Sequence, residues 1–489
     1  MALSTQILKI LDQNLDIKEL QTFPPTDKTT ITDAETKNQA IKVANTAGKM
    51  YPTIVLNNYK FTNQDIVFFE LTEKDFLPTI KVVIDDKNGL LSNMIFPKDN
   101  CIMNVYIGSG SADIRAVRCD FLVYSIEPAG SAPIDMENRG AGYTYLIKGV
   151  LNIPLMTNYD ISCYNSSSYD ALFEIAKKLR IGFATNEIST ADAMPWIQPN
   201  IKNIDFIKDI TEHAYKDDDS FFISFVDKYY NLTLVNVNEM LSQEESYDAA
   251  YLFENAVESI AAGSGNSSDN LISKDNGENA IKNILSNFTG IKGTNLYIKS
   301  YKTKSNQGEI LLNKPNKENI FYYDIEQSKE NDKKFLNYYI KSTFRVIDDD
   351  VVENNQNQNV RNEWFWTKVG NEHENYIYAQ EINKLNIAEL EKTQMVITTD
   401  GISLNLMRGM RVPIVIIKNE SSEIELLTKI NKRNLAKISE MEQLGFYFDE
   451  KLSGYYIIKD MTIRYSKTAR GESKFETEAT LWKRFWGIN

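Results

Sequence analysis

Histidine and cysteine, two side chains often used as general base and as nucleophile, are scarce in this 489-residue chain, which has 2 His and 3 Cys. The two histidines, His213 and His373, lie far apart in the sequence, each in a stretch with a helical pattern. Imidazole can act as a general base near neutral pH, but a solvated or capping histidine is the ordinary case on a helix. No serine, threonine or cysteine stands in a nucleophile-elbow pattern. The sequence therefore predicts no catalytic residue and a protein that is not an enzyme.

The three cysteines, Cys101, Cys119 and Cys163, lack the spacing of zinc ligands and have no histidine nearby in the sequence. Their odd number favours reduced thiols in a reducing compartment. The start of the chain, Met1–Gln6, lacks the pattern of a signal peptide. No apolar run approaches the length of about 18 residues that a membrane span needs. We therefore expect assembly in the cytoplasm, without membrane insertion.

Acidic and glycine-rich turns could bind ions. Asp217–Asp219 and Asp348–Asp350 lack the alternating ligands and the central glycine of a calcium loop. Asp85–Gly89 is typical of a hairpin turn, and the loops that begin at Gly108 and Gly263 lack the lysine of a phosphate loop. The sequence therefore predicts no metal-binding residue, no cofactor-binding residue and no cofactor.

The charge of the chain argues against sequence-specific nucleic-acid binding. The net charge is −13, and an acidic surface repels phosphate. Two clusters, Trp364–Trp366 and Trp482–Trp486, interleave aromatic with charged residues and could stack bases. In so acidic a chain we interpret them as filling the ends of β-domains or a subunit contact.

The clearest sequence of elements runs from Asn165 to Met240. Capping residues at Asn165–Ser168 precede a helical stripe, and a second helix carries Phe206, Ile207, Ile210 and Ala214. A β-hairpin follows, with its loop at Asp227–Tyr230 and a β-bulge between Leu234 and Val235. Between the helices we expect two irregular segments, a turn-rich exit at Ile181–Asn186 and a rigid elbow at Pro195–Asn200.

Strand patterns dominate on both sides of this module. Six strands with no helix between them indicate an antiparallel barrel or sandwich, namely Thr53–Phe61, Asp65–Leu71, Thr79–Asp85, Ile102–Gly108, Ala116–Ile126 and Tyr143–Asn152. A second β-domain follows a helix at His373–Glu391, with strands at Gln394–Thr399, Met410–Ile417, Tyr455–Tyr465 and Ser473–Trp482. A helical pattern at Ser422–Leu444 interrupts this domain, and we expect that insertion to pack on its outside.

These patterns predict six segments. They are an N-terminal helix and extended arm (1–50), a first β-barrel (51–156), an α+β module (157–245), a flexible linker (246–293), a β-rich connecting segment (294–362) and a second β-barrel with the insertion 422–444 (363–489). The predicted class is α+β and rich in strands.

Several phrases resemble one known family. The order IAKKLRIGFATN, WIQPN and IDFIKDITEHAYKDDDSFFISFVDKYYNLTLVNVNEM looks like the middle segment of baseplate hub proteins of contractile-tailed bacteriophages, in the late-control-D-like hub family. The segments Asp65–Leu71 and Leu77–Asp86 are similar to the first tube-like domain of such hubs. The phrases ISLNLMRGMRVPIVI and LSGYYIIKDMTIRYS are similar to the second.

The resemblance implies a structural protein of the virion, located in the tail baseplate. Two tube-like antiparallel β-barrels per chain would form a homotrimeric ring that adapts the six-fold tail tube to a trimeric tail spike, for DNA ejection. Other baseplate proteins would be further partners. The chain ends after its last strand without a needle-like repeat, so we expect the spike to be a separate polypeptide.

Two alternatives remain open at this point. The chain could be the equivalent hub of a non-viral contractile injection system, which the sequence does not separate from a phage hub. It could also be a tail-associated cell-wall hydrolase, but that function predicts paired catalytic acids or a zinc triad.

Overall fold

The computed structural model describes residues 21–23, 51–91, 101–108, 117–128, 143–242, 251–253, 297–305, 317–323, 338–345, 360–366, 372–400, 406–416, 451–467 and 473–484, with short gaps at 57–58, 62, 87–88, 90 and 453. The predicted N-terminal helix, most of the arm, Asp348–Asp350 and the insertion Ser422–Leu444 lie outside these residues. None of the described helices is long and apolar enough to cross a bilayer.

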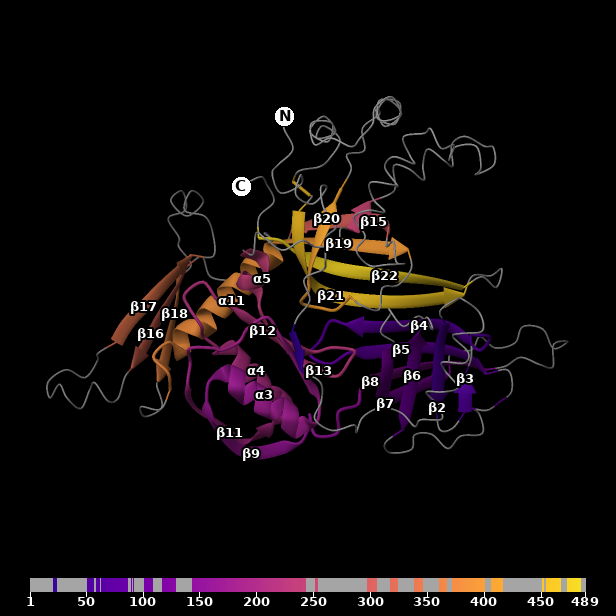
Figure 1. Cartoon of the computed structure of the whole chain (residues 1–489), viewed down its shortest axis with the longest axis horizontal. Coiled ribbons are helices and arrows are strands. Elements are labelled where there is room, and N and C mark those ends of the chain that lie inside the picture. Colours follow the sequence, from indigo (N-terminus) through magenta and orange to yellow (C-terminus); the bar gives the residue numbers. More distant parts are fainter. Residues whose placement is uncertain are drawn as a thin grey trace, which may run out of the picture.

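Thirteen of the described strands form one sheet that runs through both expected β-domains (Figure 1). In order these strands are β20 (Arg411–Val415), β14 (Tyr251–Phe253), β15 (Tyr297–Ser305), β19 (Thr393–Asp400), β22 (Ser473–Trp482), β21 (Gly454–Lys467), β4 (Ile66–Glu73), β5 (Thr79–Asp86), β8 (Tyr143–Leu151), β7 (Val117–Pro128), β6 (Ile102–Gly108), β2 (Tyr51–Leu56) and β3 (Tyr59–Phe61). β20 also pairs with β21, and β14 lies parallel to both β15 and β20. The other pairs in the sheet are antiparallel.

The two expected β-domains meet where β4 pairs with β21. The register runs from Glu73 opposite Met461 to Phe68 opposite Ser466, and Figure 1 shows these strands side by side. The prediction of a β-rich, antiparallel architecture is confirmed. Two separate barrels are not, because β4 and β21 continue the sheet from one expected domain into the other.

Alternation along β4 and β5 gives this part of the sheet one apolar face and one more polar face. In β4, Phe69 and Leu71 are buried, and in β5 so are Ile80 and Val82. These side chains belong to a large apolar cluster that continues into the middle module, where it includes Leu172. The intervening residues point to the opposite, more exposed face, as expected for period-2 strands.

The middle module contains two smaller sheets and three helices. Its four-stranded sheet has the order β1 (Gln21–Phe23), β10 (Gly182–Thr185), β13 (Asn231–Asn236) and β12 (Phe222–Val226), and β9 (Tyr159–Ser166) pairs with β11 (Met194–Lys202). The helices are α3 (Ser168–Leu179), α4 (Asn203–Glu212) and α5 (Val237–Ser242). The hydroxyl of Ser167 caps α3 by accepting a hydrogen bond from the backbone N–H of Asp170.

Two segments expected to be irregular are strands. Gly182–Thr185, in the expected turn, pairs in parallel with β13. The expected elbow lies within β11, where Pro195 and Pro199 face Asn165 and Ile161 of β9. Proline is tolerated there because β11 has one described strand partner, so the side without an N–H can face away from it.

The β12–β13 hairpin is confirmed, but the predicted bulge is wrong. The register is continuous, with Ser224 opposite Leu234 and Ile223 opposite Val235. β13 is buried along its whole length, so apolar residues occupy both of its faces. The shift in alternation therefore reflects burial on both faces, not an inserted residue.

The helix α11 (Tyr376–Lys392) leads into the second part of the large sheet. It lies beside the module and next to a three-stranded sheet of β17 (Tyr338–Arg345), β16 (Lys317–Tyr323) and β18 (Val360–Trp366) (Figure 1). Tyr251–Phe253, expected within a flexible linker, instead forms β14 of the large sheet.

Candidate functional site

The structure brings the two histidines together. His373 lies just before α11, and its Nε2 atom is 3.0 Å from the carbonyl oxygen of His213. Tyr376 stacks on the His213 ring with centroids 3.8 Å apart. The rings of Trp196 and Tyr215 lie beside His373. This aromatic cluster joins the end of α4 to the start of α11, a contact that helical periodicity alone does not predict.

His213 is placed as a packing residue. Its side chain is buried, and Nδ1 lies 2.8 Å from the carbonyl oxygen of Asp209. Burial is the main cause that lowers the pKa of His213 to about 4. The imidazole is therefore neutral at neutral pH and is covered by Tyr376, so it is not open to a substrate.

Asn383 of α11 strengthens the same contact. Its Nδ2 atom donates hydrogen bonds to the carbonyl oxygens of Thr211 (3.2 Å) and Glu212 (2.7 Å) at the end of α4. Its Oδ1 atom accepts a hydrogen bond of 2.7 Å from the backbone N–H of Phe222. The last carbonyls of a helix need partners from outside the helix, and here a single amide fixes α11 to both α4 and β12.

Asp217–Asp219 form the turn between α4 and β12. Oδ1 of Asp217 accepts hydrogen bonds from the backbone N–H of Asp219 (3.1 Å) and from the hydroxyl of Ser220 (2.6 Å). These contacts are those of an aspartate that stabilises its own turn. Within the part of the chain that the structure describes, no group of three His, Cys, Asp or Glu side chains is placed to hold a metal ion.

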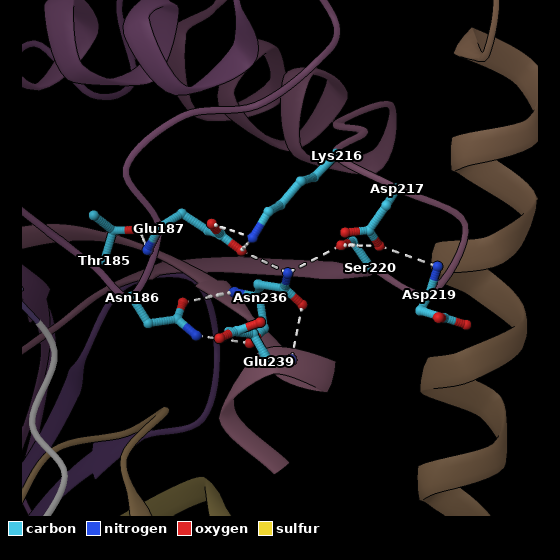
Figure 2. A network of polar contacts seen from close by, with 9 residues as sticks. All are labelled: Thr185, Asn186, Glu187, Lys216, Asp217, Asp219, Ser220, Asn236 and Glu239. Atoms are coloured by element: carbon cyan, nitrogen blue, oxygen red, sulfur yellow. Dashed lines mark hydrogen bonds and ion pairs between the residues drawn. The ribbon is translucent and has the colours of Figure 1, made fainter. Parts of the chain in front are cut away.

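A buried polar network lies beside this turn (Figure 2). The Asn236 Nδ2 atom donates to Glu187 (2.6 Å) and to the hydroxyl of Ser220 (3.1 Å). Lys216 pairs with the same Glu187 carboxylate at 2.9 Å. The backbone N–H of Asn236 also bonds the side chain of Asn186. Because these donors link Glu187 to Lys216 and Asn236, the network fixes the loops of the module.

The structure also places several of the remaining candidates from the sequence. Cys101 and Cys119 are buried and Cys163 is exposed, all as free thiols. Asp86 begins a turn in which Gly89 has φ +65°, but β5 pairs with β8 and not with the next strand, so the turn does not close the predicted hairpin. Trp482 is buried in β22.

A buried ion pair joins three parts of the molecule, and we call it the buried joint. Lys228, in the β12–β13 turn, contacts the Glu73 carboxylate of β4 at 3.1 Å and the carbonyl oxygen of Leu406 at 2.5 Å. Its backbone N–H also donates to Glu73, at 2.9 Å. Both charged side chains are almost wholly buried. The pair therefore links the first β-domain, the module and the segment before β20.

Other contacts hold the same turn against the first β-domain. The Cys119 thiol donates to the carbonyl oxygen of Lys228 at 3.0 Å, and the Tyr230 hydroxyl accepts a hydrogen bond of 2.7 Å from the backbone N–H of Asp120. Asp227 accepts hydrogen bonds from backbone N–H groups of the turn itself. Burial raises the pKa of Cys119, so this thiol is a contact group and not a nucleophile.

Arg408 makes a second set of contacts across the domains. Its Nε and Nη1 atoms donate to the carbonyl oxygens of Lys459 (2.5 Å) and Asp75 (2.8 Å). The guanidinium lies 4.4 Å from the centre of the Phe225 ring and 3.8 Å from the Asp460 carboxylate. One arginine thus contacts β21, the β4–β5 turn and β12.

Gly409 allows this close approach. Its φ is +82°, and a Cβ atom there would lie 2.9 Å from Val235 of the module. Both the backbone conformation and the lack of space require glycine at this position.

The polar face of the large sheet carries a row of charged side chains that we call the charge ladder. It crosses six neighbouring strands in the order Glu478, Arg464, Glu70, Lys81, Lys148 and Glu127. Arg464 contacts Glu478 of β22 at 2.8 Å and, across the β4–β21 pairing, Glu70 at 2.9 Å. Lys81 contacts Glu70 at 3.1 Å, and Lys148 contacts Glu127 at 2.8 Å.

Every cation of the charge ladder has a carboxylate partner. Burial acts to raise the pKa of Glu70, but hydrogen bonds from Arg464 and Lys81 outweigh it and hold that pKa below its usual range. The hydrogen bond from Lys148 lowers the pKa of Glu127. Both acids are therefore ionised at neutral pH, and the three cations are locally neutralised. This row could not be predicted from the sequence, because the pairing of its side chains depends on the register between strands.

No family model matches the chain, and no curated protein matches it. Among solved structures it is similar to the tail protein from Neisseria meningitidis MC58 (10% identity, 89% of this chain and 98% of that chain, TM-score 0.45). It is also similar to the 43 kDa tail protein of prophage MuSo2 from Shewanella oneidensis (10% identity, 88% and 98%, TM-score 0.46). A third similarity is to a chain of the Francisella PdpA–VgrG complex (11% identity, 90% and 59%, TM-score 0.37).

Two of these neighbours are tail proteins, one of them from a prophage, and the third is part of a VgrG-containing complex. The likeness is one of overall arrangement, and no residue's role follows from it.

Proposed function

We propose that this chain is a structural baseplate hub of a contractile tail and has no enzymatic role. Three copies would form a ring that carries the six-fold tail tube on one face and the trimeric spike on the other. The single observation that carries this proposal is the pairing of β4 with β21. It holds two β-domains side by side, and three such chains present six β-domains around one axis.

The buried joint supports the same function. A hub that matches two symmetries needs a fixed angle between its two β-domains, because a variable angle would open the ring. Lys228 of the module makes buried contacts with both β-domains, and Arg408 contacts both of them and packs on Phe225 of the module. The module therefore acts as a brace for the pair of β-domains.

The experiment is a determination of mass and symmetry. The purified full chain, mixed with the trimeric spike of the same tail, is measured by light scattering and by negative-stain electron microscopy. We expect three times the 56.0 kDa of one chain per spike trimer and a three-fold ring with six peripheral lobes. A dimeric or tetrameric assembly in this mixture contradicts the proposal.

A further inference from the structure

We propose that the outer edge of β9 accepts an extended segment of another protein of the tail, which adds a third strand to the ribbon of β9 and β11. That segment carries apolar residues at alternate positions and an acidic residue at the end that meets Tyr159. The inference goes beyond the ring and its symmetry, and it rests on the proposed hub function only for the source of the segment.

One face of the β9–β11 ribbon is packed against the module. Trp196 of β11 is buried, and its ring lies beside that of Tyr376. Tyr164 of β9 stacks on Phe206 of α4. Figure 1 shows the ribbon at the margin of the module, with α3 and α4 on one side of it. This face is therefore occupied by elements of the same chain.

The other face of the ribbon is open and apolar. Tyr159 and Ile161 of β9 and Ile197 of β11 are 65%, 77% and 57% exposed. Pro199, which lies opposite Ile161, is exposed as well. Single apolar side chains are ordinary on a protein surface, but adjoining ones mark a contact site. Because these residues are neighbours in the ribbon, they form one patch.

The prolines of β11 determine which backbone groups of β9 point outward. A proline has no N–H group, so the pairs of Pro195 with Asn165 and of Pro199 with Ile161 are not doubly hydrogen-bonded. In an antiparallel ribbon the residues of such pairs direct their N–H and C=O groups away from the partner strand. The backbone groups of Ile161, Cys163 and Asn165 therefore point to the outer edge of β9.

This edge is open where two others in the module are closed. Among the described residues, β9 has β11 as its one strand partner. On the outer edge of β12, the backbone N–H groups of Phe222 and Val226 donate to Asn383 Oδ1 (2.7 Å) and to the carbonyl oxygen of Phe76 (2.8 Å). The outer edge of β11 carries prolines, which prevent strand pairing. The edge of β9 has neither protection, and an unprotected edge beside an apolar patch is suited to strand addition.

The charges of the ribbon define the polarity of the added segment. Asp160 and Lys202 are its two charged residues, and Asp160 is paired with Lys178 of α3. The Nζ atom of Lys202 lies 5.8 Å from the centre of the Tyr159 ring, and no carboxylate of the described chain pairs with it. An acidic residue of the segment at this end would supply the partner, whereas the rest of the patch favours apolar side chains.

Strand addition is tested by hydrogen exchange in the purified chain and in the assembled tail that contains it, with fragmentation that resolves single amides. In the chain alone, the amides of Ile161, Cys163 and Asn165 should exchange fast. In the tail they should exchange at least about tenfold more slowly, because a ladder bond must open first. The control is the amide of Ile197, which points to the edge with the prolines and should keep its rate.

The other outcomes overturn the inference. Fast exchange of the β9 amides in the tail does so and leaves the hub function standing. Slow exchange in the chain alone does so too: if the rate is independent of concentration, a segment of the same chain covers the edge, and if it falls with rising concentration, a second copy does. Absence of the chain from purified tails overturns the hub function together with the inference.

The need for the backbone of β9 is tested with a proline. Ile161→Pro removes one outward N–H group and leaves the bonds to β11, since proline is tolerated on the outward side of a ribbon, as Pro199 shows. Ile161→Val is the matched control and keeps the N–H group. The reporter is the thiol of Cys163, which is exposed while Cys101 and Cys119 are buried.

In the tail, the reaction of Cys163 with a maleimide should be slowed at least about tenfold for the unsubstituted chain and for Ile161→Val, as burial under an added strand requires. Ile161→Pro should either stay out of the tail or enter it with a reactive thiol. Equal protection in both variants overturns the inference. Circular dichroism checks that the variants fold, and Asn165→Pro provides the same test at the other end of the edge.

Discussion

The two β-domains are joined twice, and the two joints differ in kind. The buried joint places one ion pair, Lys228 with Glu73, out of contact with water. The charge ladder crosses the same boundary on the open face, where Arg464 is about one third exposed. Exposed pairs contribute little to stability, whereas a buried charge depends strongly on its partner. The buried joint therefore fixes the geometry of the domains, and the ladder determines the chemistry of a surface.

The largest effect is expected from breaking the buried joint. Lys228→Met leaves the Glu73 carboxylate buried without its cation, which should lower the free energy of unfolding by about 3–5 kcal/mol. Urea unfolding followed by tryptophan fluorescence measures this loss. Adding Glu73→Leu removes the isolated charge, so the double variant should recover most of the stability. A single variant that loses less than about 1 kcal/mol would contradict the distinction between the two joints.

A smaller, pH-dependent effect is expected at the contact between α4 and α11. The pKa of His213 is about 4 in the folded chain, with burial as the main cause, against about 6.5 when unfolded. Below pH 6.5 the unfolded chain binds a proton that the folded chain does not, so stability falls as the pH falls. The groups that face His213 are Asp209 and Glu212 of α4. From the neighbouring segment they are His373, just before α11, and Tyr376 and Lys384 of α11.

The size of this effect follows from linkage. Between pH 7 and pH 5 His213 should remove about 2 kcal/mol of unfolding free energy. His213→Phe keeps a ring against Tyr376 but cannot take a proton. The difference in stability between the two pH values should therefore shrink by that amount in urea titrations of the variant. An unchanged pH dependence would show that His213 titrates normally.

The smallest effect is expected in the charge ladder. Arg464→Met removes the cation that links Glu70 to Glu478, and it should cost less than about 1 kcal/mol because the pairs are partly exposed and screened by salt. The same urea titration at low and high salt measures it. A loss as large as that of Lys228→Met would mean that both joints hold the domains together, and the comparison would fail.

Regular local patterns were predictable from the sequence. The strands of the first β-domain, the helices α3, α4 and α11 and the β12–β13 hairpin follow from spacing and capping residues close in the chain. β9 and β11 were missed because their pairing partners come from either side of a helix, and Pro195 and Pro199 suggested an elbow. Tertiary pairing overrode the local signal there.

The contacts that carry the proposals were not predictable. Lys228 looks like an ordinary turn lysine in sequence, and only the fold shows that its partner is Glu73, 155 positions away. The pairing of Glu70 with Arg464 likewise depends on the register between β4 and β21. The closeness of His213 and His373 was missed for the same reason, since helical spacing gives a face but not its neighbour.

The pairing of β4 with β21 has a consequence for biosynthesis. Glu70 and Arg464 are 394 residues apart, so at ribosomal rates roughly 20 to 80 s separate the synthesis of the two strands. During that interval β4 is the unpaired edge of a nascent sheet and is exposed to pairing with strands of other nascent chains. Glu70, in the middle of that edge, is a charge of the kind that discourages such contacts. Glu70 can thus protect β4 from such contacts until β21 has been synthesised.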